Sequence, residues 1–150
     1  MAKVMIMVDN EEDLKSIEDE KKILEEFGIF YDIKIFSGMD NLNFLDEFIE
    51  TVEKTGVDVI IINCRIATHL PGIIASKTIV PVIGVPLPAN NIPSEDNIFS
   101  IVQMPEGVPV ACMSLGKAGV KNSAIFAIQI LSRKDKSLIE KLKKFKNQFT

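Results

Sequence analysis

Residues 57–86 read VDVIIINCRIATHLPGIIASKTIVPVIGVP, and the rest of the chain can be arranged around this stretch. Residues 57–62 are β-branched except for Asp58 and show no polar alternation, as expected for a strand that is covered on both faces of a parallel sheet. Pro71 suits the first turn of a brief helix over residues 70–76, and Pro81 opens a second buried strand. The stretch therefore predicts a strand, a short helix and a parallel strand.

The loop that leaves the first of these strands carries polar and reactive side chains. Asn63, Cys64, Arg65 and His69 follow the strand, and ligands of open parallel sheets bind at the carboxyl ends of strands. His69 is the only histidine, and no carboxylate accompanies it at a fixed spacing, so we predict no metal site. We interpret it as a structural or pocket-lining residue and a possible catalytic one. A thiolate pair of Cys64 and His69 is a weaker alternative.

The remaining elements alternate along a single domain, residues 1–150. Expected strands cover residues 4–8, 31–36 and 108–115. One expected helix begins near Asn10, a second ends near Gly56, and three more cover residues 96–104, 120–131 and 135–149. Asn10 and Asp13 have capping-box spacing. The pattern predicts an α/β fold of the flavodoxin-like, doubly wound kind, with a five-stranded parallel sheet in the order 2-1-3-4-5 and a C-terminal amphipathic helix.

Charge is distributed unevenly along the 150 residues, of which 47% are hydrophobic. Residues 59–131 contain only 3 acidic and 4 basic side chains, so we expect part of this surface to be buried between subunits. The net charge of −4 and the lack of a basic patch with interleaved aromatic residues argue against nucleic acid as a partner. Two cysteines, no signal segment and no membrane-length apolar run predict a cytoplasmic protein without membrane partners.

Four blocks of the sequence resemble one enzyme family. They are ATHLPG (residues 67–72), PVIGVP (81–86), SIVQMPEGVP (100–109) and GKAGVKN (116–122). They are similar to blocks of the phosphoribosylaminoimidazole (AIR) carboxylase family, whose bacterial members are carboxyaminoimidazole ribonucleotide mutases of purine synthesis. The resemblance implies a three-layer α/β/α sandwich, a homo-octamer with sites at subunit contacts, no cofactor, and a C-terminal helix (residues 135–149) that packs on a neighbouring subunit.

The catalytic positions depart from the family pattern. Where the family has Gly-Ser-x-Ser-Asp, residues 9–13 read DNEED, and only Asp13 matches. Where it has Ser-Ala-His-Arg, residues 37–40 read SGMD, so Met39 and Asp40 replace a histidine and an arginine. The family's Gly-Ala-Gly-Gly becomes residues 63–66, NCRI. The resemblance therefore implies substrate contacts only at Asp13, Ser37, His69 and Leu70.

These substitutions bear on the chemistry. Moving a carboxylate from nitrogen to a ring carbon needs a group that shuttles a proton and a site for the ribose phosphate. Met39 cannot transfer protons, and Asp40 places negative charge where phosphate should bind. We therefore favour a noncatalytic or repurposed octameric paralogue, with another small anion or no ligand in its pocket. The alternative is an active enzyme of purine synthesis whose altered proton path runs through His69 or Asp13.

Arg65 allows two interpretations. Its guanidinium could hold phosphate bidentately, or it could pair with a carboxylate and, with Asn10 and Asp40, fill the pocket. We favour pocket filling, because side chains that replace glycines occupy ligand space. In the order 2-1-3 the turns that carry Asp40, Asp13 and Arg65 leave neighbouring strand ends, so we expect Arg65 to reach at least one of the two carboxylates.

Overall fold

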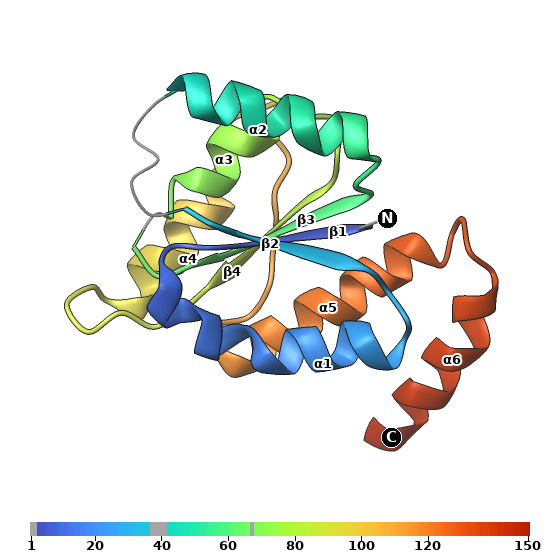
Figure 1. The fold of residues 1–150 in the computed structure, drawn as a ribbon. Coiled ribbons are helices and arrows are strands. Elements are labelled where there is room, and N and C mark those ends of the chain that lie inside the picture. The colour runs from blue at the N-terminus through green and yellow to red at the C-terminus, as the bar shows by residue number, and fades with distance from the viewer. Residues whose placement is uncertain (1–2, 37–41, 67) are drawn as a thin grey trace.

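The computed structural model describes residues 3–36, 42–66 and 68–150, and it contains one sheet of five parallel strands in the order β2-β1-β3-β4-β5 (Figure 1). The expected strand order is therefore confirmed. Ser37, Met39 and Asp40 lie outside the described residues. The strands are β1 (Val4–Val8), β2 (Tyr31–Ile35), β3 (Val59–Cys64), β4 (Val82–Pro86) and β5 (Ala111–Cys112).

Helices cover both faces of the sheet and make the α/β/α sandwich (Figure 1). α2, α3 and α4 lie on one face, and α1 and α5 lie on the other, with α6 packed at their end. A 3-10 helix, η1, leads directly into α1, and a second, η2, follows α6. The bounds are η1 (Glu11–Ile17), α1 (Glu18–Glu26), α2 (Leu42–Thr55), α3 (Leu70–Ala75), α4 (Ser94–Val102), α5 (Lys117–Leu131), α6 (Ser137–Lys146) and η2 (Asn147–Phe149).

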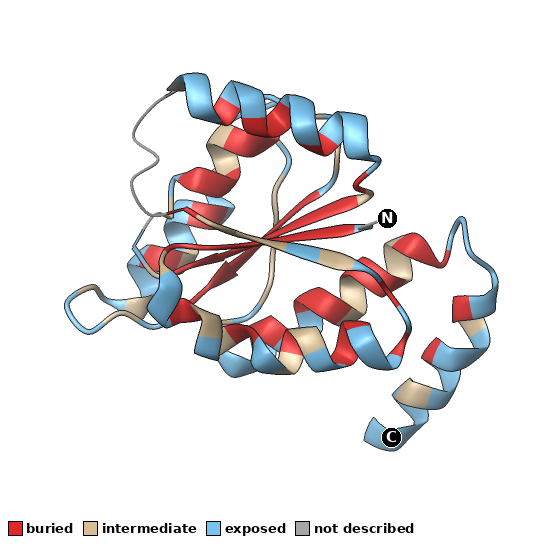
Figure 2. Ribbon diagram, in the orientation of Figure 1, coloured by how far each residue is buried: buried red, intermediate tan, exposed pale blue. Residues whose placement is uncertain are grey.

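β3 is the central strand, and it is buried along its whole length (Figure 2). Val59 and Ile61 pack into the core beneath α1 and α5, whereas Ile60 and Ile62 pack beneath α2 and α3. This two-sided burial is the reason that its sequence shows no polar alternation. The strand begins two residues later than expected, because the N–H of Val57 bonds to Val52 O at the end of α2.

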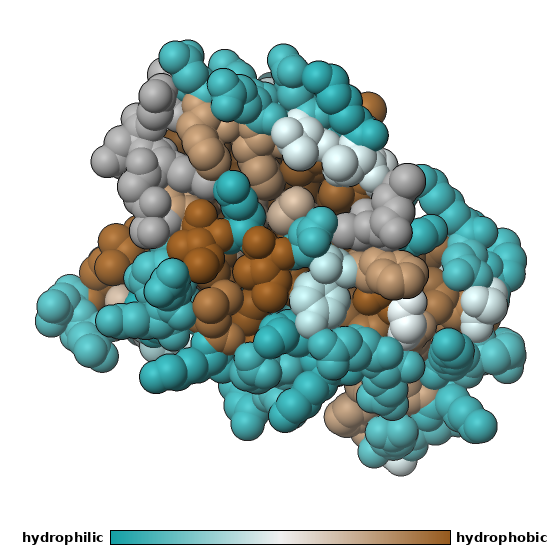
Figure 3. All heavy atoms as spheres, viewed as in Figure 1, coloured by the Kyte–Doolittle hydropathy of each residue, from teal (hydrophilic) through white to brown (hydrophobic). Residues whose placement is uncertain are grey.

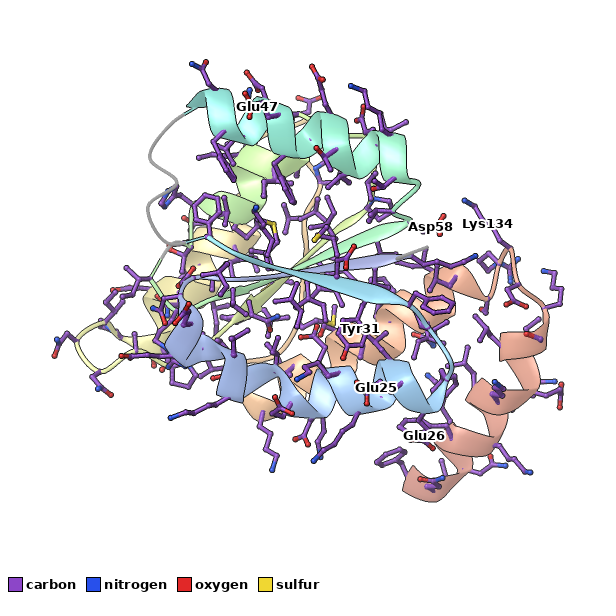
Figure 4. The ribbon with its side chains drawn as sticks, viewed as in Figure 1. Glu25, Glu26, Tyr31, Glu47, Asp58 and Lys134 are labelled. Atoms are coloured by element: carbon purple, nitrogen blue, oxygen red, sulfur yellow. The ribbon has the colours of Figure 1, made fainter. Side chains whose placement is uncertain are left out.

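β2 forms one edge of the sheet, as its alternating sequence predicts. Its hydrophobic residues Tyr31, Ile33 and Ile35 are half-buried against the core. Figure 3 shows hydrophobic side chains across the middle of the face on which this edge lies, with hydrophilic ones over the outer helices. Tyr31 also donates a 2.6 Å hydrogen bond to Glu25 of α1, and Figure 4 shows these two side chains together.

Two local expectations are wrong. Of the strand expected over residues 108–115, only Ala111–Cys112 pairs with the sheet. The N–H of Val108 donates to Pro105 O instead of to β4, and Pro109 has no N–H to donate. The capping box is not formed either: Asn10 Oδ1 accepts the N–H of Glu12 instead, at 3.0 Å. The Asp13 side chain does not return to the helix start, because it binds a residue of the site described below.

The C-terminal helix α6 packs on its own chain. Leu138 and Leu142 are buried in the core shared with α5, and the ring of Phe145 meets Phe27 edge-on with centroids 5.5 Å apart. Lys134, just before α6, forms a 2.8 Å ion pair with Asp58 ahead of β3 (Figure 4). Contact with a neighbouring subunit stays a prediction for the outer side of α6. None of the described helices is long and apolar enough to cross a membrane.

Candidate functional site

The candidate site lies at the carboxyl edge of the sheet, where β1 and β3 end side by side. Val8 pairs with Asn63, so β1 ends one residue before β3 and the loops that follow leave the same edge side by side. Asp9 is 8% exposed, and its Oδ2 accepts the backbone N–H groups of Arg65 and Ile66, each at 2.7 Å. The turn after β1 therefore fixes the main chain of the loop after β3.

The side chain of Arg65 is held by three groups, which we call the Arg65 clasp. Nε donates to Asp13 Oδ1 at 2.7 Å, Nη2 donates to Ser16 Oγ at 3.2 Å, and Nη1 donates to Pro88 O. Asp13 and Ser16 belong to η1, and Pro88 follows β4. The expectation that Arg65 reaches a carboxylate is confirmed for Asp13.

The clasp leaves unused hydrogen-bonding capacity on both charged partners. A guanidinium has five N–H donors, and the three bonds to described residues occupy three of them. Asp13 is 3% exposed, yet its Oδ2 has no hydrogen-bond partner among the residues that the structure describes. A buried carboxylate oxygen without a donor is costly. Among the described residues, the guanidinium of Arg65 therefore keeps two N–H donors for further acceptors, and Asp13 Oδ2 stays enclosed without a donor.

A hollow of about 410 Å³ opens beside the clasp. Arg65, Ser16 and Pro88 form one side, and Lys15, Lys117 and Gly116 lie around it, together with the acidic Glu18 and Asp19. Asp19 sits between Lys117 and Lys121, at 3.7 and 3.8 Å from their amino groups. The hollow is consequently mixed in charge, and Arg65 is the cation held rigidly at its wall.

The other expected site residues are placed separately. His69 is exposed at the start of α3, and no hydrogen bond joins it to Arg65 or Asp13 in the described part of the chain. Leu70 is 1% exposed and packs in the core, so only its backbone is available to a ligand. Asn10 caps η1. Within the described ranges, no group of three or more His, Cys, Asp or Glu side chains could hold a metal ion.

Asn63 and Cys64 are not in the site, contrary to the expectation from their place after β3. Both are fully buried within the last residues of that strand, and their side chains point to opposite faces of the sheet. Burial, followed by the nearby charge of Asp9, raises the pKa of the Cys64 thiol. A Cys64 thiolate paired with His69 is therefore disfavoured.

Sequence reasoning misses the residues that support the clasp. In the sequence Asp9 is one of several acids, Ser16 resembles a surface residue, and Asn97 falls in an expected helix without a role. The amide of Asn97 donates to Arg65 O at 3.2 Å and to Leu87 O at 2.9 Å, which ties the loop to β4. One signal is present: an aspartate directly after a buried strand lies at the same sheet edge as the loop after the neighbouring strand.

Comparisons with known proteins agree on one family. The family described as AIR carboxylase matches residues 3–150. The N5-carboxyaminoimidazole ribonucleotide mutase of Saccharolobus solfataricus is 43% identical over 145 residues, covering 97% of this chain and 90% of that protein. The protein of the same name from Pyrococcus abyssi is 41% identical over 146 residues, covering 97% of this chain and 83% of that protein.

The fold is also found among solved structures. The crystal structure of Treponema denticola PurE superposes with a TM-score of 0.78, at 23% sequence identity, covering 97% of this chain and 89% of that one. The crystal structure of a single-substitution variant of PurE2 from the same organism gives the same TM-score. At this level of identity the likeness concerns the arrangement of the strands and helices.

Proposed function

Because this chain belongs to the AIR carboxylase family, we propose that it acts on the carboxyaminoimidazole ribonucleotide named in its relatives. The site would be the carboxyl edge at β1, β3 and β4, and the step would be part of purine synthesis. One observation carries the proposal: Arg65 lines the hollow and keeps two N–H donors unused among described residues. A ribonucleotide offers the complement, a phosphate whose oxygens accept hydrogen bonds from a guanidinium.

In this proposal His69 moves the proton. Transfer of a carboxylate from nitrogen to a ring carbon requires one group that accepts a proton and returns it. His69 is the only histidine of the chain, and it is exposed at the start of α3 on the same edge of the sheet. Asp13 is less suited to this role, because it is 3% exposed and its Oδ1 already accepts the Arg65 Nε–H at 2.7 Å.

A second candidate is a protein that binds an anion without turnover. It is supported by the clasp itself, since Asp13, Ser16 and Pro88 already hold Arg65 in place. It is also supported by Met39 and Asp40, which stand where the family pattern implies a histidine and an arginine. In this second candidate the fold is retained and the catalytic activity is lost.

One experiment separates the two candidates. Purified protein is given carboxyaminoimidazole ribonucleotide with a ¹³C label in the carboxylate, and NMR follows the label from nitrogen to carbon. We expect turnover that His69→Asn abolishes while binding, measured by calorimetry, is retained. Binding without turnover would establish the second candidate, and absence of both would overturn both.

Two further variants sharpen the assignment. Arg65→Met should weaken binding of the ribonucleotide, whereas Lys54→Met, which removes an exposed cation on α2, should not. The double variant Met39→His, Asp40→Arg restores the residues of the family pattern and tests the second candidate. We expect at most partial recovery of a missing activity, because Asn10 and Glu12 remain altered.

We also propose that the chain assembles as a homo-octamer, in the reduced cytoplasm that its sequence predicts. Large hydrophobic side chains on the described surface support this: Ile79 is 95% exposed, Phe99 53% and Val102 50%. A hollow of about 560 Å³ between β4, β5 and α5 is lined largely by apolar residues, among them Phe126 and Ile130. Sedimentation at micromolar concentration tests the assembly, and a monomer or dimer would refute it.

A further inference from the structure

A second polar cluster lies beneath the clasp, sealed inside the core. It consists of Glu20 on α1, Asn63 on β3 and Ser123 on α5, and all three residues are 0% exposed. Asn63 Nδ2 donates to Glu20 Oε2 at 3.0 Å, and Ser123 Oγ lies 2.9 Å from Glu20 Oε1. Three elements distant in sequence therefore meet at one carboxyl group.

The three hydrogen bonds made by Glu20 and Ser123 each have their own donor only when Glu20 is protonated, whereas Asn63 Oδ1 has no partner among the described residues in either state. Ser123 Oγ is 2.7 Å from Val120 O and 2.9 Å from Glu20 Oε1, but a hydroxyl has a single hydrogen. If Glu20 is ionised, both neighbours are acceptors and compete for that hydrogen. If Oε1 carries a proton, it donates to Ser123 Oγ, and Ser123 donates to Val120 O. Each contact then has one donor and one acceptor.

The surroundings of Glu20 provide no compensating charge. The ionisable residues on the elements around the cluster are Glu11, Glu12, Asp13 and Lys15 on η1, Glu18, Asp19, Lys21, Lys22, Glu25 and Glu26 on α1, Lys117 and Lys121 on α5, and Cys64 on β3. Lys117 and Lys121 lie near Asp19, and Cys64 belongs to the core on the opposite face of the sheet. No ion pair joins Glu20 to a cation anywhere in the described ranges.

The cluster fixes the same two segments that the Arg65 clasp joins. η1 carries Asp13 and Ser16 and continues without a break into α1, where Glu20 is the third residue. On the other side, Asn63 precedes Arg65 by two residues and is anchored in β3. A shift of the first turn of α1 away from β3 would therefore move Asp13 and Ser16 away from Arg65.

We propose that Glu20 is protonated in the folded protein and that this proton holds α1 against β3 and α5, so that η1 can clasp Arg65. Glu20 is a positioning residue, since it does not line the hollow beside Arg65. When hydroxide removes the proton, the buried carboxylate needs water, α1 moves off β3, and Arg65 is released for an external anion. Burial raises the pKa of Glu20 to about 8, which places this change just above neutral pH.

Infrared spectroscopy tests the protonation state directly. We expect wild-type protein at pH 7 to show the carbonyl absorption of a protonated carboxyl group that Glu20→Gln lacks. The band should disappear at pH 9. The control is Glu26→Gln, which removes an exposed carboxylate at the end of the same helix (Figure 4) and should keep the band. Identical spectra for wild type and Glu20→Gln at pH 7 would overturn the proposal.

Binding of inorganic phosphate tests the coupling to Arg65. Between pH 7 and pH 9, calorimetry should show the affinity of wild type rising by about threefold or more relative to Glu20→Gln, in which a neutral amide maintains the clasp at both pH values. Subtracting the variant removes the titration of phosphate itself. Parallel pH curves would refute the coupling. If Glu20→Gln does not fold, Glu20→Met provides the non-titrating reference, and the loss of the wild-type infrared band remains decisive.

Discussion

Asp13 and Glu20 are two buried carboxyl groups that lie near each other in the sequence. They differ in the partners that surround them. Asp13 is 3% exposed and is paired with a guanidinium at 2.7 Å, while Glu20 is 0% exposed and has only an amide and a hydroxyl as partners. The first has a cation beside it. The second has none, and burial favours its neutral form.

The comparison shows that burial alone does not define the role of an acidic residue. Asp13 uses its charge to hold a side chain at a hollow that is open to solvent, which suits a ligand site. Glu20 uses hydrogen bonds to join three elements inside the core, which suits a structural or positioning role. Four measurements test this distinction.

The greatest change is expected for Glu20→Gln as a function of pH. A group whose pKa is raised from 4.5 to about 8 in the folded state contributes stability that is complete below pH 4.5 and is lost as pH rises to about 8. The variant cannot titrate at this position. The difference between its unfolding free energy and that of wild type should therefore shift in favour of the variant by about 1.4 kcal/mol per pH unit in that window. The difference should reach about 4 kcal/mol at pH 8. Urea unfolding at several pH values measures it, and a constant difference would contradict a neutral Glu20.

Asp13→Ala should come next. Removing one partner of a buried pair leaves an uncompensated charge and costs about 3 to 5 kcal/mol, and the partial exposure of Arg65 lowers the expectation to about 3 kcal/mol. Glu12→Ala, on the exposed side of the same turn, is the matched control. In the double variant with Arg65→Met the loss should be smaller than the sum of the two single losses. Additive losses would mean that the pair is not coupled.

Asp40→Ala should act on binding more than on stability. Asp40 lies outside the described residues, but it follows β2 in the sequence at the position where the family pattern implies an arginine, so we expect its charge to repel an anion. Removing it should raise the affinity for ribose 5-phosphate by about fivefold, the equivalent of about 1 kcal/mol. Asp46→Ala removes an exposed acid at the start of the following helix and serves as the control. Equal effects of the two variants in calorimetric titration would argue against an anion site at the carboxyl edge of the sheet.

Glu50→Gln should change the protein least. Glu50 and Lys54 form a 3.1 Å ion pair on α2, but their side chains are 70% and 75% exposed. Water solvates both charges, so the unfolding free energy should change by less than about 0.5 kcal/mol. A loss comparable to that of Asp13→Ala would show that exposure is not what separates the two ion pairs.

The order of the strands is accessible from the residue pattern. Buried runs without polar alternation in β1, β3 and β4 mark strands covered on both faces, and the alternation of β2 marks an edge. The meeting of Arg65 and Asp13 follows from the same information, because carboxyl ends of neighbouring parallel strands share one edge. Patterns of this kind persist over several residues and therefore survive small errors in the bounds of an element.

The partners of individual polar groups are not accessible in this way. Glu20 looks like one more acid in the first turn of a helix, where acids favour the helix dipole, and nothing in its neighbours indicates burial. Its partners lie 43 and 103 residues away, and Asp9 meets the amides of a loop 56 and 57 residues away.

Hydrophobic periodicity thus specifies the α/β architecture and the edge of the sheet at which polar loops meet, because burying apolar surface is a property of whole segments. Which acidic side chain gains a cation as its partner depends on a few ångströms between side chains from different segments. Those distances are set by how α1, β3 and α5 pack together, so the roles of Glu20 and Arg65 emerge only in the folded chain.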